Sequence, residues 1–475
     1  MLFFHPDIFS MKKILFTILI TLSWGTAFSQ HSSLAYQTLA DSLFAHHHYK
    51  DAIEFYQKAL KKSPHPGALM LQLAKCHYKM NLITEAEKWF AKAKQNHGSF
   101  KTQDYYEFAR VLMVLKKKQQ ADTLLEHVLQ NDPDNKIVKK TLEDLRNFEK
   151  YYQDSAAVSI ASLSINTPTS EFGSVYYRDG IVFASSRPEG SSRKKSHWDN
   201  SPFLNLYYSR KTPDQRFEEP KLFEDDLDTR HHDGPAVFYS QYQKMIINRN
   251  QRVEVKGRKN VFEWRPGLYD AHLDPAKSSW QVTALPFNNP NYSYLHPSIS
   301  EDGSVLYFAS DKPGGYGGTD IYRVVRTNGS WALAVNLGPA VNTAEDEAFP
   351  FFVDNTLYFT SNGHGGLGGL DIFRSEQLGA DFTPPINLGY PINSTADDFS
   401  FVTEVGQRNG YFASSRTGND DLFSFRKLST NQVLAMGLVI NNAGEGIDGF
   451  RATITSKNAG SDIPVHTGNG VMTFI

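Results

Sequence analysis

The chain has 475 residues, which is enough for several domains. Its 49 Lys and Arg residues are balanced by 51 Asp and Glu residues, so the overall charge favours neither nucleic acid nor an anionic membrane as a partner. The single cysteine, Cys76, excludes a disulfide framework and a cysteine metal cluster, and we expect it to be a small buried residue of a helix.

The N-terminus has the pattern of a secretory signal peptide. Residues 11–13 are basic, residues 14–22 are apolar, and residues 27–29 include the small residues that a signal peptidase reads. The apolar run is too short for a comfortable membrane span. We therefore predict residues 1–29 as a signal peptide that truly starts at Met11. We expect no lipid anchor, because no cysteine follows the apolar run, and no transmembrane segment after cleavage.

Residues 30–148 are predicted to be helical, because they contain little proline or glycine and small residues recur in them at a fixed step. Two columns of alanine return every 34 or 35 residues, and a larger apolar residue follows each second-column alanine by four. The expected packing positions are Ala40, Ala52, Tyr56, Ala74, Ala86, Phe90, Ala109, Ala121 and Leu125. Alanine lets two helices cross closely, and the larger residue fills the next groove. The pattern resembles the tetratricopeptide repeat and predicts three helix pairs with a concave face.

Residues 149–169 lose this period and are predicted to be a linker. Within it, residues 159–166 alternate as a strand would, and we expect them to lead into the first blade of the next domain.

Residues 170–430 repeat one pattern at a step of about 50 residues, namely an apolar strand that ends in Ser and then a second strand that begins with Asp. The three clearest copies carry Ser310, Asp320 and Tyr322, then Ser361, Asp371 and Phe373, and then Ser414, Asp421 and Phe423. Weaker copies start at Gly180 and Lys244. A small sheet of this kind buries both faces only when it packs radially against its neighbours, which predicts a β-propeller. We expect five blades, with a sixth left open because the sequence does not show how the ring closes.

Residues 431–475 contain two predicted strands around a glycine-rich turn. They resemble the start of a carboxypeptidase-regulatory-like β-sandwich, of which about half the usual length is present. Because the sequence stops inside a predicted strand at Ile475, we interpret it as truncated.

The glycine-rich loops Gly314–Gly318 and Gly365–Gly369 invite a search for phosphate or calcium sites. No helix and no Lys-Ser/Thr pair follows them, so we expect hairpin connections instead. We expect Asp320, Asp371 and Asp421 to cap turns by accepting backbone N–H groups, with a cation or a partner as the alternative.

The histidine clusters give no convincing metal spacing. His46–His48 is predicted to be a solvated turn, since consecutive helical residues point to different faces, and His231 and His232 lie in a polar loop. We find no nucleophile elbow, His-Glu-x-x-His motif or catalytic triad, and we predict no catalytic, cofactor-binding or metal-binding residue.

One long insertion is a candidate protein-contact loop, although a solvated excursion is the simpler interpretation. Its candidate residues are Arg193, Lys194, Lys195, Trp198 and Phe203.

The order of these parts resembles the multidomain OmpA-family envelope proteins of Bacteroidota, one branch of which is the peptidoglycan-associated subunit of the type IX secretion machinery. In that family a C-terminal OmpA-like domain binds peptidoglycan, but this sequence ends before any such domain, so no wall-binding residue is carried over.

The resemblance implies a non-catalytic periplasmic scaffold associated with the outer membrane. It would hold envelope proteins through the helical groove and the propeller face, and peptidoglycan only through a further C-terminal domain. The alternatives are a propeller that binds a glycan or muropeptide, and the N-terminal portion of a larger propeller-containing peptidase.

Overall fold

The structure is a computed structural model. It describes residues 28–64, 66–188, 196, 201–224, 227–229, 231–254, 262–277 and 279–428, together with five short strands between residues 436 and 473. Most of the predicted signal peptide lies outside the described residues. In the described part of the chain, no helix has the length and apolar character that a bilayer crossing requires.

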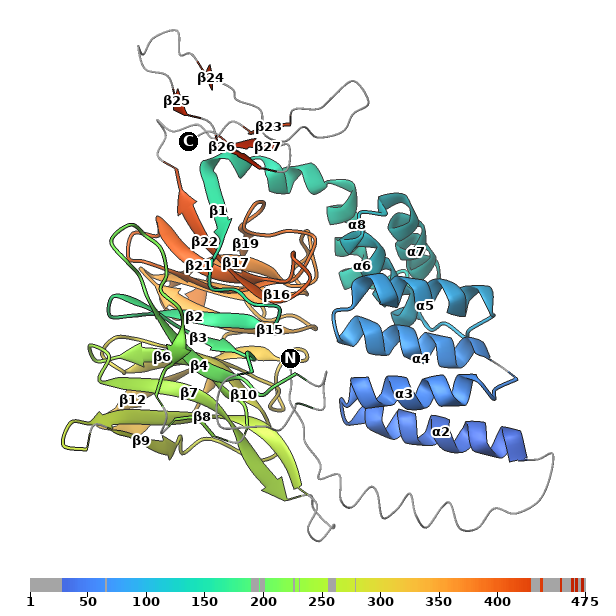
Figure 1. Ribbon diagram of the computed structural model, residues 1–475, viewed down its shortest axis with the longest axis horizontal. Helices are drawn as coiled ribbons and strands as arrows, with labels where there is room; N and C mark the ends of the chain where they lie inside the picture. The colour runs from blue at the N-terminus through green and yellow to red at the C-terminus, as the bar shows by residue number, and fades with distance from the viewer. Residues whose placement is uncertain are drawn as a thin grey trace.

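The N-terminal part is a stack of helices that lies beside a β-propeller (Figure 1). The helices are α2 (Phe28–Ala45), α3 (Tyr49–Leu60), α4 (Pro66–Lys79), α5 (Ile83–Gln95), α6 (Thr102–Val114), α7 (Lys118–Asn131) and α8 (Lys136–Arg146). Consecutive helices pack as pairs, α2 with α3, α4 with α5 and α6 with α7, and α8 packs on α7. The predicted helical repeat is therefore present as three pairs with one added helix.

Local sequence explains where two of these helices begin. At the start of α8, the side chain of Asn135 accepts a hydrogen bond from the backbone N–H of Val138 at 3.0 Å. At the start of α6, the Asp104 carboxylate accepts from the backbone N–H of Lys101 at 2.8 Å. Each bond satisfies a polar group that a helix end leaves without an internal partner.

The propeller has five blades, so the predicted ring is confirmed with five blades and without a sixth. Blades 1 and 2 are built from β2 (Glu171–Tyr177), β3 (Gly180–Ser185), β4 (Asn205–Arg210) and β5 (Lys221–Leu222), and from β6 (Asp233–Tyr239), β7 (Lys244–Glu254), β8 (Phe262–Asp274) and β9 (Ser279–Ala284). Blade 3 contains β10 (Tyr294–Ile299), β11 (Val305–Ser310), β12 (Asp320–Thr327), β13 (Ser330–Trp331) and β14 (Val335–Asn336). Blade 4 contains β15 (Glu347–Val353), β16 (Thr356–Ser361), β17 (Asp371–Leu378), β18 (Asp381–Phe382) and β19 (Ile386–Asn387).

The ring closes through the segment that we had assigned to a linker. Blade 5 contains β20 (Asp398–Thr403), β21 (Asn409–Ser414), β22 (Asp421–Lys427) and, as its outermost strand, β1 (Val158–Ser162). The alternating residues do form a strand, but this strand pairs with β22 at the far end of the domain instead of leading into blade 1. This pairing joins the two ends of the domain within one blade and covers the edge of β22.

The C-terminal region is described only in part. Strands β23 (Met436–Leu438), β26 (His466–Gly468) and β27 (Val471–Thr473) form one small sheet, and β24 (Thr453–Ile454) pairs with β25 (Ile463–Pro464). The remainder of the predicted β-sandwich lies outside the described residues.

Candidate functional site

The predicted packing positions of the helical repeat all lie inside the stack. Ala40, Ala52, Tyr56, Ala74, Ala86, Phe90, Ala109, Ala121 and Leu125 each have a side chain with no exposed surface. Cys76 is also fully buried, in α4, and burial raises the pKa of its thiol. These residues shape the helices, and a partner cannot reach them.

The repeated residues of the propeller face each other across neighbouring strands. Ser310 is paired with Asp320, and Ser361 with Asp371. Asp320 accepts a hydrogen bond from the backbone N–H of Tyr316 at 2.8 Å, as expected for a turn cap. The other two aspartates of the repeat behave in a related way, since Asp371 accepts from the N–H of Gly368 at 3.0 Å and Asp421 accepts from the Thr417 hydroxyl.

Sequence reasoning missed a second repeated feature, an asparagine clamp between neighbouring blades. Asn342 accepts from the backbone N–H of Ile321 at 2.7 Å and donates to the carbonyl of the same residue at 3.0 Å. The same pair of bonds joins Asn393 to Ile372, Asn288 to Leu268 and Asn166 to Leu422. Each clamp fixes the segment before one blade to the third strand of the preceding blade. Asn166 precedes blade 1 and is bonded to Leu422 of blade 5. This clamp therefore joins the first and last blades, as the pairing of β1 with β22 does.

A signal for this clamp was present in the sequence. Asn166, Asn342 and Asn393 each stand five residues before the acidic residue that begins an innermost strand, namely Glu171, Glu347 and Asp398. Alignment of the copies on this pair would have placed Asn166 in the propeller and not in a linker.

The acidic residues at the starts of the innermost strands are buried and hydrogen-bonded. Glu347 accepts from the backbone N–H and the hydroxyl of Thr343, both at 2.7 Å, and from the Ser361 hydroxyl at 2.6 Å. Burial nevertheless raises its pKa to about 7. Asp233 forms an ion pair with Arg249 at 2.8 Å, and burial raises its pKa to about 6. These carboxyl groups bind other groups of the same protein at the ends of strands. We therefore assign them a structural role.

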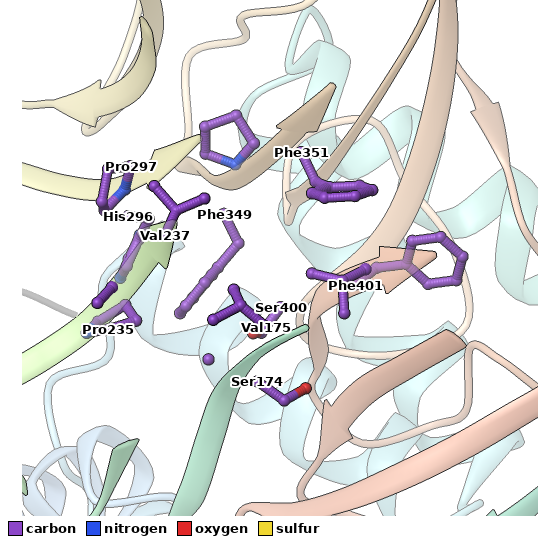
Figure 2. Close-up of a pocket in the computed structure, with 14 residues that line it drawn as sticks. Ser174, Val175, Pro235, Val237, His296, Pro297, Phe349, Phe351, Ser400 and Phe401 are labelled. Carbon is purple, nitrogen blue, oxygen red and sulfur yellow. The ribbon is translucent and has the colours of Figure 1, made fainter. Parts of the chain in front are cut away.

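The central channel of the propeller is filled by side chains from the innermost strands of all five blades (Figure 2). His296 stacks on Phe349 with ring centroids 3.5 Å apart, and Phe349 lies 5.1 Å from Phe399. The free volume that remains is about 30 Å³, and a buried water needs roughly 10–15 Å³ of such space. The channel therefore has room for about two water molecules, which is too little for a sugar ring.

Two candidate clusters differ from their predictions. His48 is 2% exposed, so the predicted solvated turn is wrong for this residue: its side chain packs inside the helix stack. His232 is also buried, accepts from the backbone N–H of Leu204 at 3.1 Å, and has its pKa lowered by burial to about 3. Among the described residues, no group of His, Cys, Asp and Glu side chains is arranged to hold a metal ion.

Only part of the predicted contact loop lies within the described residues. Arg193, Lys194, Lys195 and Trp198 lie outside the described residues. Phe203 is 3% exposed and its ring lies 4.7 Å from that of His232, so it packs inside the propeller and is not a contact residue.

A contact between the helices and the loops of blades 4 and 5 joins the two domains. We call the residues on the helical side the inner helical face: Arg110 and Val114 of α6, and Lys140 and Asp144 of α8. We call Gly365–Gly369, which connects β16 to β17, the docking loop.

The docking loop touches the inner helical face at both of its ends. At one end, the Arg110 guanidinium donates to the carbonyl of Gly369 at 2.5 Å. At the other end, a Cβ atom placed on Gly365 would lie 2.0 Å from the Asp144 carboxylate, so only glycine allows the backbone to approach this closely. Leu367, between these ends, is 6% exposed.

Further contacts extend this interface along the chain. The Thr395 hydroxyl donates to the carbonyl of Val114 at 3.4 Å. Beyond α8, the backbone N–H of Tyr390 donates to the carbonyl of Tyr151 at 2.8 Å, and the rings of Tyr390 and Tyr152 stack with centroids 4.8 Å apart. The interface therefore runs from α6 to the segment that enters β1.

Charged groups are concentrated at this interface. Arg110 is 8% exposed and Glu107 is 6% exposed. Burial raises the pKa of Glu107, and burial likewise raises the pKa of Glu345 and of Asp397 on the propeller side. Glu107 lies 3.8 Å from Lys79, but its second carboxylate oxygen has no hydrogen-bond partner. The interface thus contains acidic groups that are less well solvated in the buried contact than they would be in water.

These contacts change the expectation for the helical repeat. From the sequence we assign the helical groove to a partner protein, but α6, the first helix of the third pair, contacts the propeller of the same chain. The sequence could not indicate this, because Arg110 and Gly369 are 259 residues apart.

Comparison with known proteins supports the helical part directly. Residues 43–99, which cover the end of α2 and helices α3 to α5, match the tetratricopeptide repeat family. No curated protein matches the chain.

Similar solved structures cover one domain or the other. The first tetratricopeptide repeat domain of Spaghetti (RPAP3), bound to the HSP90 peptide SRMEEVD, is 21% identical, covers 26% of this chain and 95% of its own, and has a TM-score of 0.24. The Arabidopsis OM64 tetratricopeptide repeat domain is 18% identical over 25% of this chain and 98% of its own, with a TM-score of 0.23. An α-L-arabinofuranosidase from Lactobacillus brevis is 11% identical over 58% of this chain and 93% of its own, with a TM-score of 0.34. These likenesses are weak, and we infer no activity from them.

Proposed function

We propose that this protein is a non-catalytic scaffold of the bacterial periplasm, associated with the outer membrane, that holds envelope proteins together in assemblies such as the type IX secretion machinery of Bacteroidota. A tetratricopeptide repeat stack followed by a propeller indicates a protein–protein interaction scaffold. The finer assignment to the periplasm and to an OmpA-family assembly is supported by the signal-peptide pattern of residues 1–29 and by the order of the predicted domains.

The observation that carries the proposal is the polar contact between the two domains. Arg110, Val114 and Tyr151 are each hydrogen-bonded to the propeller. The contacts hold the two interaction modules side by side in one chain, so partners bound to the two modules would be kept close to each other. Such an arrangement raises the effective concentration of one partner for the other without any chemistry.

The propeller face supports this function in a second way. Its central channel is filled by Phe349, Phe399 and His296, so the surface that a partner would meet is the rim of loops around it. Loops on a rigid scaffold are the usual carriers of binding function.

The test is to locate the native protein and its neighbours. Envelope fractions of the source bacterium would be cross-linked and examined by mass spectrometry, with peptide coverage followed to the C-terminus. We expect the protein in the periplasmic or outer-membrane fraction, cross-linked through both domains to envelope proteins. A cytoplasmic location, or cross-links within the chain only, would overturn the proposal.

The same experiment separates the proposal from its main alternative. If the native species carries a hydrolase domain beyond Ile475, a propeller-containing peptidase is the better assignment. An OmpA-like domain there would make peptidoglycan a further partner of the scaffold.

A further inference from the structure

The docking loop has a counterpart at the same position in blade 3. This counterpart shows the conformation of such a loop when it is exposed. Gly314–Gly318 of blade 3 lies 51 residues earlier and connects β11 to β12 as the docking loop connects β16 to β17. Tyr316 occupies the position of Leu367. Yet Tyr316 is 51% exposed whereas Leu367 is 6% exposed, and Gly314 has open space where Gly365 meets Asp144.

Both loops are held in shape by their own blade. Asp320 accepts from the N–H of Tyr316, and Asp371 accepts from the N–H of Gly368. Gly317 and Gly368 both lie against the backbone that precedes the next blade. Since the blade 3 loop keeps this shape without a helical partner, the docking loop does not need the inner helical face in order to fold. Undocking would therefore cost the loop none of its own hydrogen bonds.

The interface itself is a compromise between gained contacts and lost hydration. The Arg110 bond and the burial of Leu367 favour docking. Against them, one carboxylate oxygen of Asp144, which lies against Gly365, is buried without a hydrogen-bond partner. Undocking would expose this oxygen to water, which offsets part of the docking energy. A polar contact of this kind resembles a transient interface more than a domain core.

The connection between the domains is short and irregular. Two single-turn 3-10 helices, Phe148–Tyr152 and Ser155–Ala157, join α8 to β1. Strand β1 is fixed in blade 5, and Tyr151 and Tyr152 contact Tyr390, so movement of the helices relative to the propeller would be absorbed before Tyr151, in residues 147–150.

From these observations we infer that the docking loop is a releasable plug. It covers the inner helical face in cis and must leave before a partner segment can bind there. The inference deepens the proposed function, because it states when the helical stack is open to a partner. It rests on that function only in assuming that a partner binds the inner helical face.

Thiol labelling of the full chain tests this inference without any partner. Leu367→Cys places a thiol on the plug, and the native Cys76, fully buried in α4, reports unfolding of the helices in the same molecule. Tyr316→Cys is the matched control on the uncovered loop. Labelling of each cysteine under native conditions would be followed by mass spectrometry of its peptide.

We expect Tyr316→Cys to react at once and Cys76 to react most slowly. Leu367→Cys should react at least about tenfold faster than Cys76 and at least about tenfold more slowly than Tyr316→Cys, because it is exposed by local opening and not by unfolding. Arg110→Glu, which replaces the donor to Gly369 with a repelling group, should bring the rate of Leu367→Cys close to that of Tyr316→Cys, and this increase should exceed any increase in the rate of Cys76, which reports the loss of helix stability.

Two results would overturn the inference. If Leu367→Cys reacts no faster than Cys76, the contact opens only with unfolding and is a permanent domain interface. If it reacts as fast as Tyr316→Cys in the otherwise native chain, the docking loop does not cover the inner helical face in solution.

Should Arg110→Glu disturb the helices, the Cys76 rate would rise and reveal it. Thr395→Arg, which perturbs the same contact from the propeller side, then takes its place. None of these rates depends on a partner, so failure of the scaffold function and failure of the plug can be told apart.

Discussion

The guanidinium group of Arg110 in α6 donates a hydrogen bond to the carbonyl oxygen of Gly369 in the loop before β17, at 2.5 Å and across 259 residues of sequence. The same group donates to the Tyr106 hydroxyl at 3.3 Å. Its positive charge also opposes the rise that burial causes in the pKa of Glu345 and in the pKa of Asp397 on the propeller. One side chain thus links the helical repeat to the propeller.

Replacement of this side chain should weaken the domain contact. Arg110→Met keeps most of the volume but loses the charge and its hydrogen bonds, and we expect a loss of about 2 kcal/mol in the free energy of unfolding, as for a buried bond to a charged group. Urea unfolding followed by far-UV circular dichroism would measure it. The control is Arg146→Met, because Arg146 pairs with Asp122 and Glu126 at an exposed site, where water screens the pair and the loss should be clearly smaller. Equal losses in the two variants would contradict the role given to Arg110.

The asparagine clamps should be more costly to remove than exposed asparagines. Asn393 has no exposed surface, and Asn393→Ala leaves the buried N–H of Ile372 without its acceptor, whereas the Ile372 carbonyl keeps its bond from the N–H of Leu388. We expect a loss of about 2 kcal/mol, since an unsatisfied buried group costs about 1–3 kcal/mol. Asn342→Ala should behave alike. Asn131→Ala is the control, because Asn131 is exposed at the end of α7 and donates to the carbonyl of His127. Thermal unfolding of the three variants side by side provides the measurement.

Ring closure should depend on the residues before the first blade. A chain that begins at Ser155 keeps β1 and Asn166, whereas one that begins at Ser170 loses both the outer strand of blade 5 and the clamp on Leu422. Both lack the helices, so the comparison isolates closure. We expect the longer chain to unfold cooperatively as a monomer. The shorter chain should expose the edge of β22 and associate or unfold, which size-exclusion chromatography and calorimetry would detect. Identical behaviour of the two chains would show that closure is dispensable.

Glu347 should make stability depend on pH in a predictable direction. Burial raises its pKa from 4.5 to about 7, so the folded protein binds more protons than the unfolded chain between these values. The free energy of unfolding should therefore fall as the pH rises from about 4.5 to about 7, and no further contribution from this group is expected above or below that window. Glu347→Gln should flatten this part of the profile, whereas Glu376→Gln on the exposed side of β17 should leave it unchanged. Denaturation at a series of pH values would show the difference.

The amino-acid sequence determined by itself those features that depend on residues close together in the chain. The two alanine columns predicted the helix pairs, because a small residue is needed wherever two neighbouring helices cross. The six alanines and the three larger residues that follow the second column all lie in the core. The repeated Ser and Asp predicted the blades, because the Ser that ends one strand pairs with the Asp that begins the next strand of the same hairpin. The turn-capping role expected of Asp320 followed from the same local pattern and is seen in its bond to Tyr316.

Only the tertiary structure decided how these parts meet. Strand β1 resembled a linker in the sequence, because its partner β22 lies more than 250 residues later and no local pattern identifies it. Leu367 and Tyr316 show the limit most clearly, since they occupy equivalent positions in two loops of the same design. One is buried and the other exposed, because α6 and α8 reach one blade and not the other. Local sequence specifies the shape of such a loop, whereas its burial depends on which distant surface packs against it.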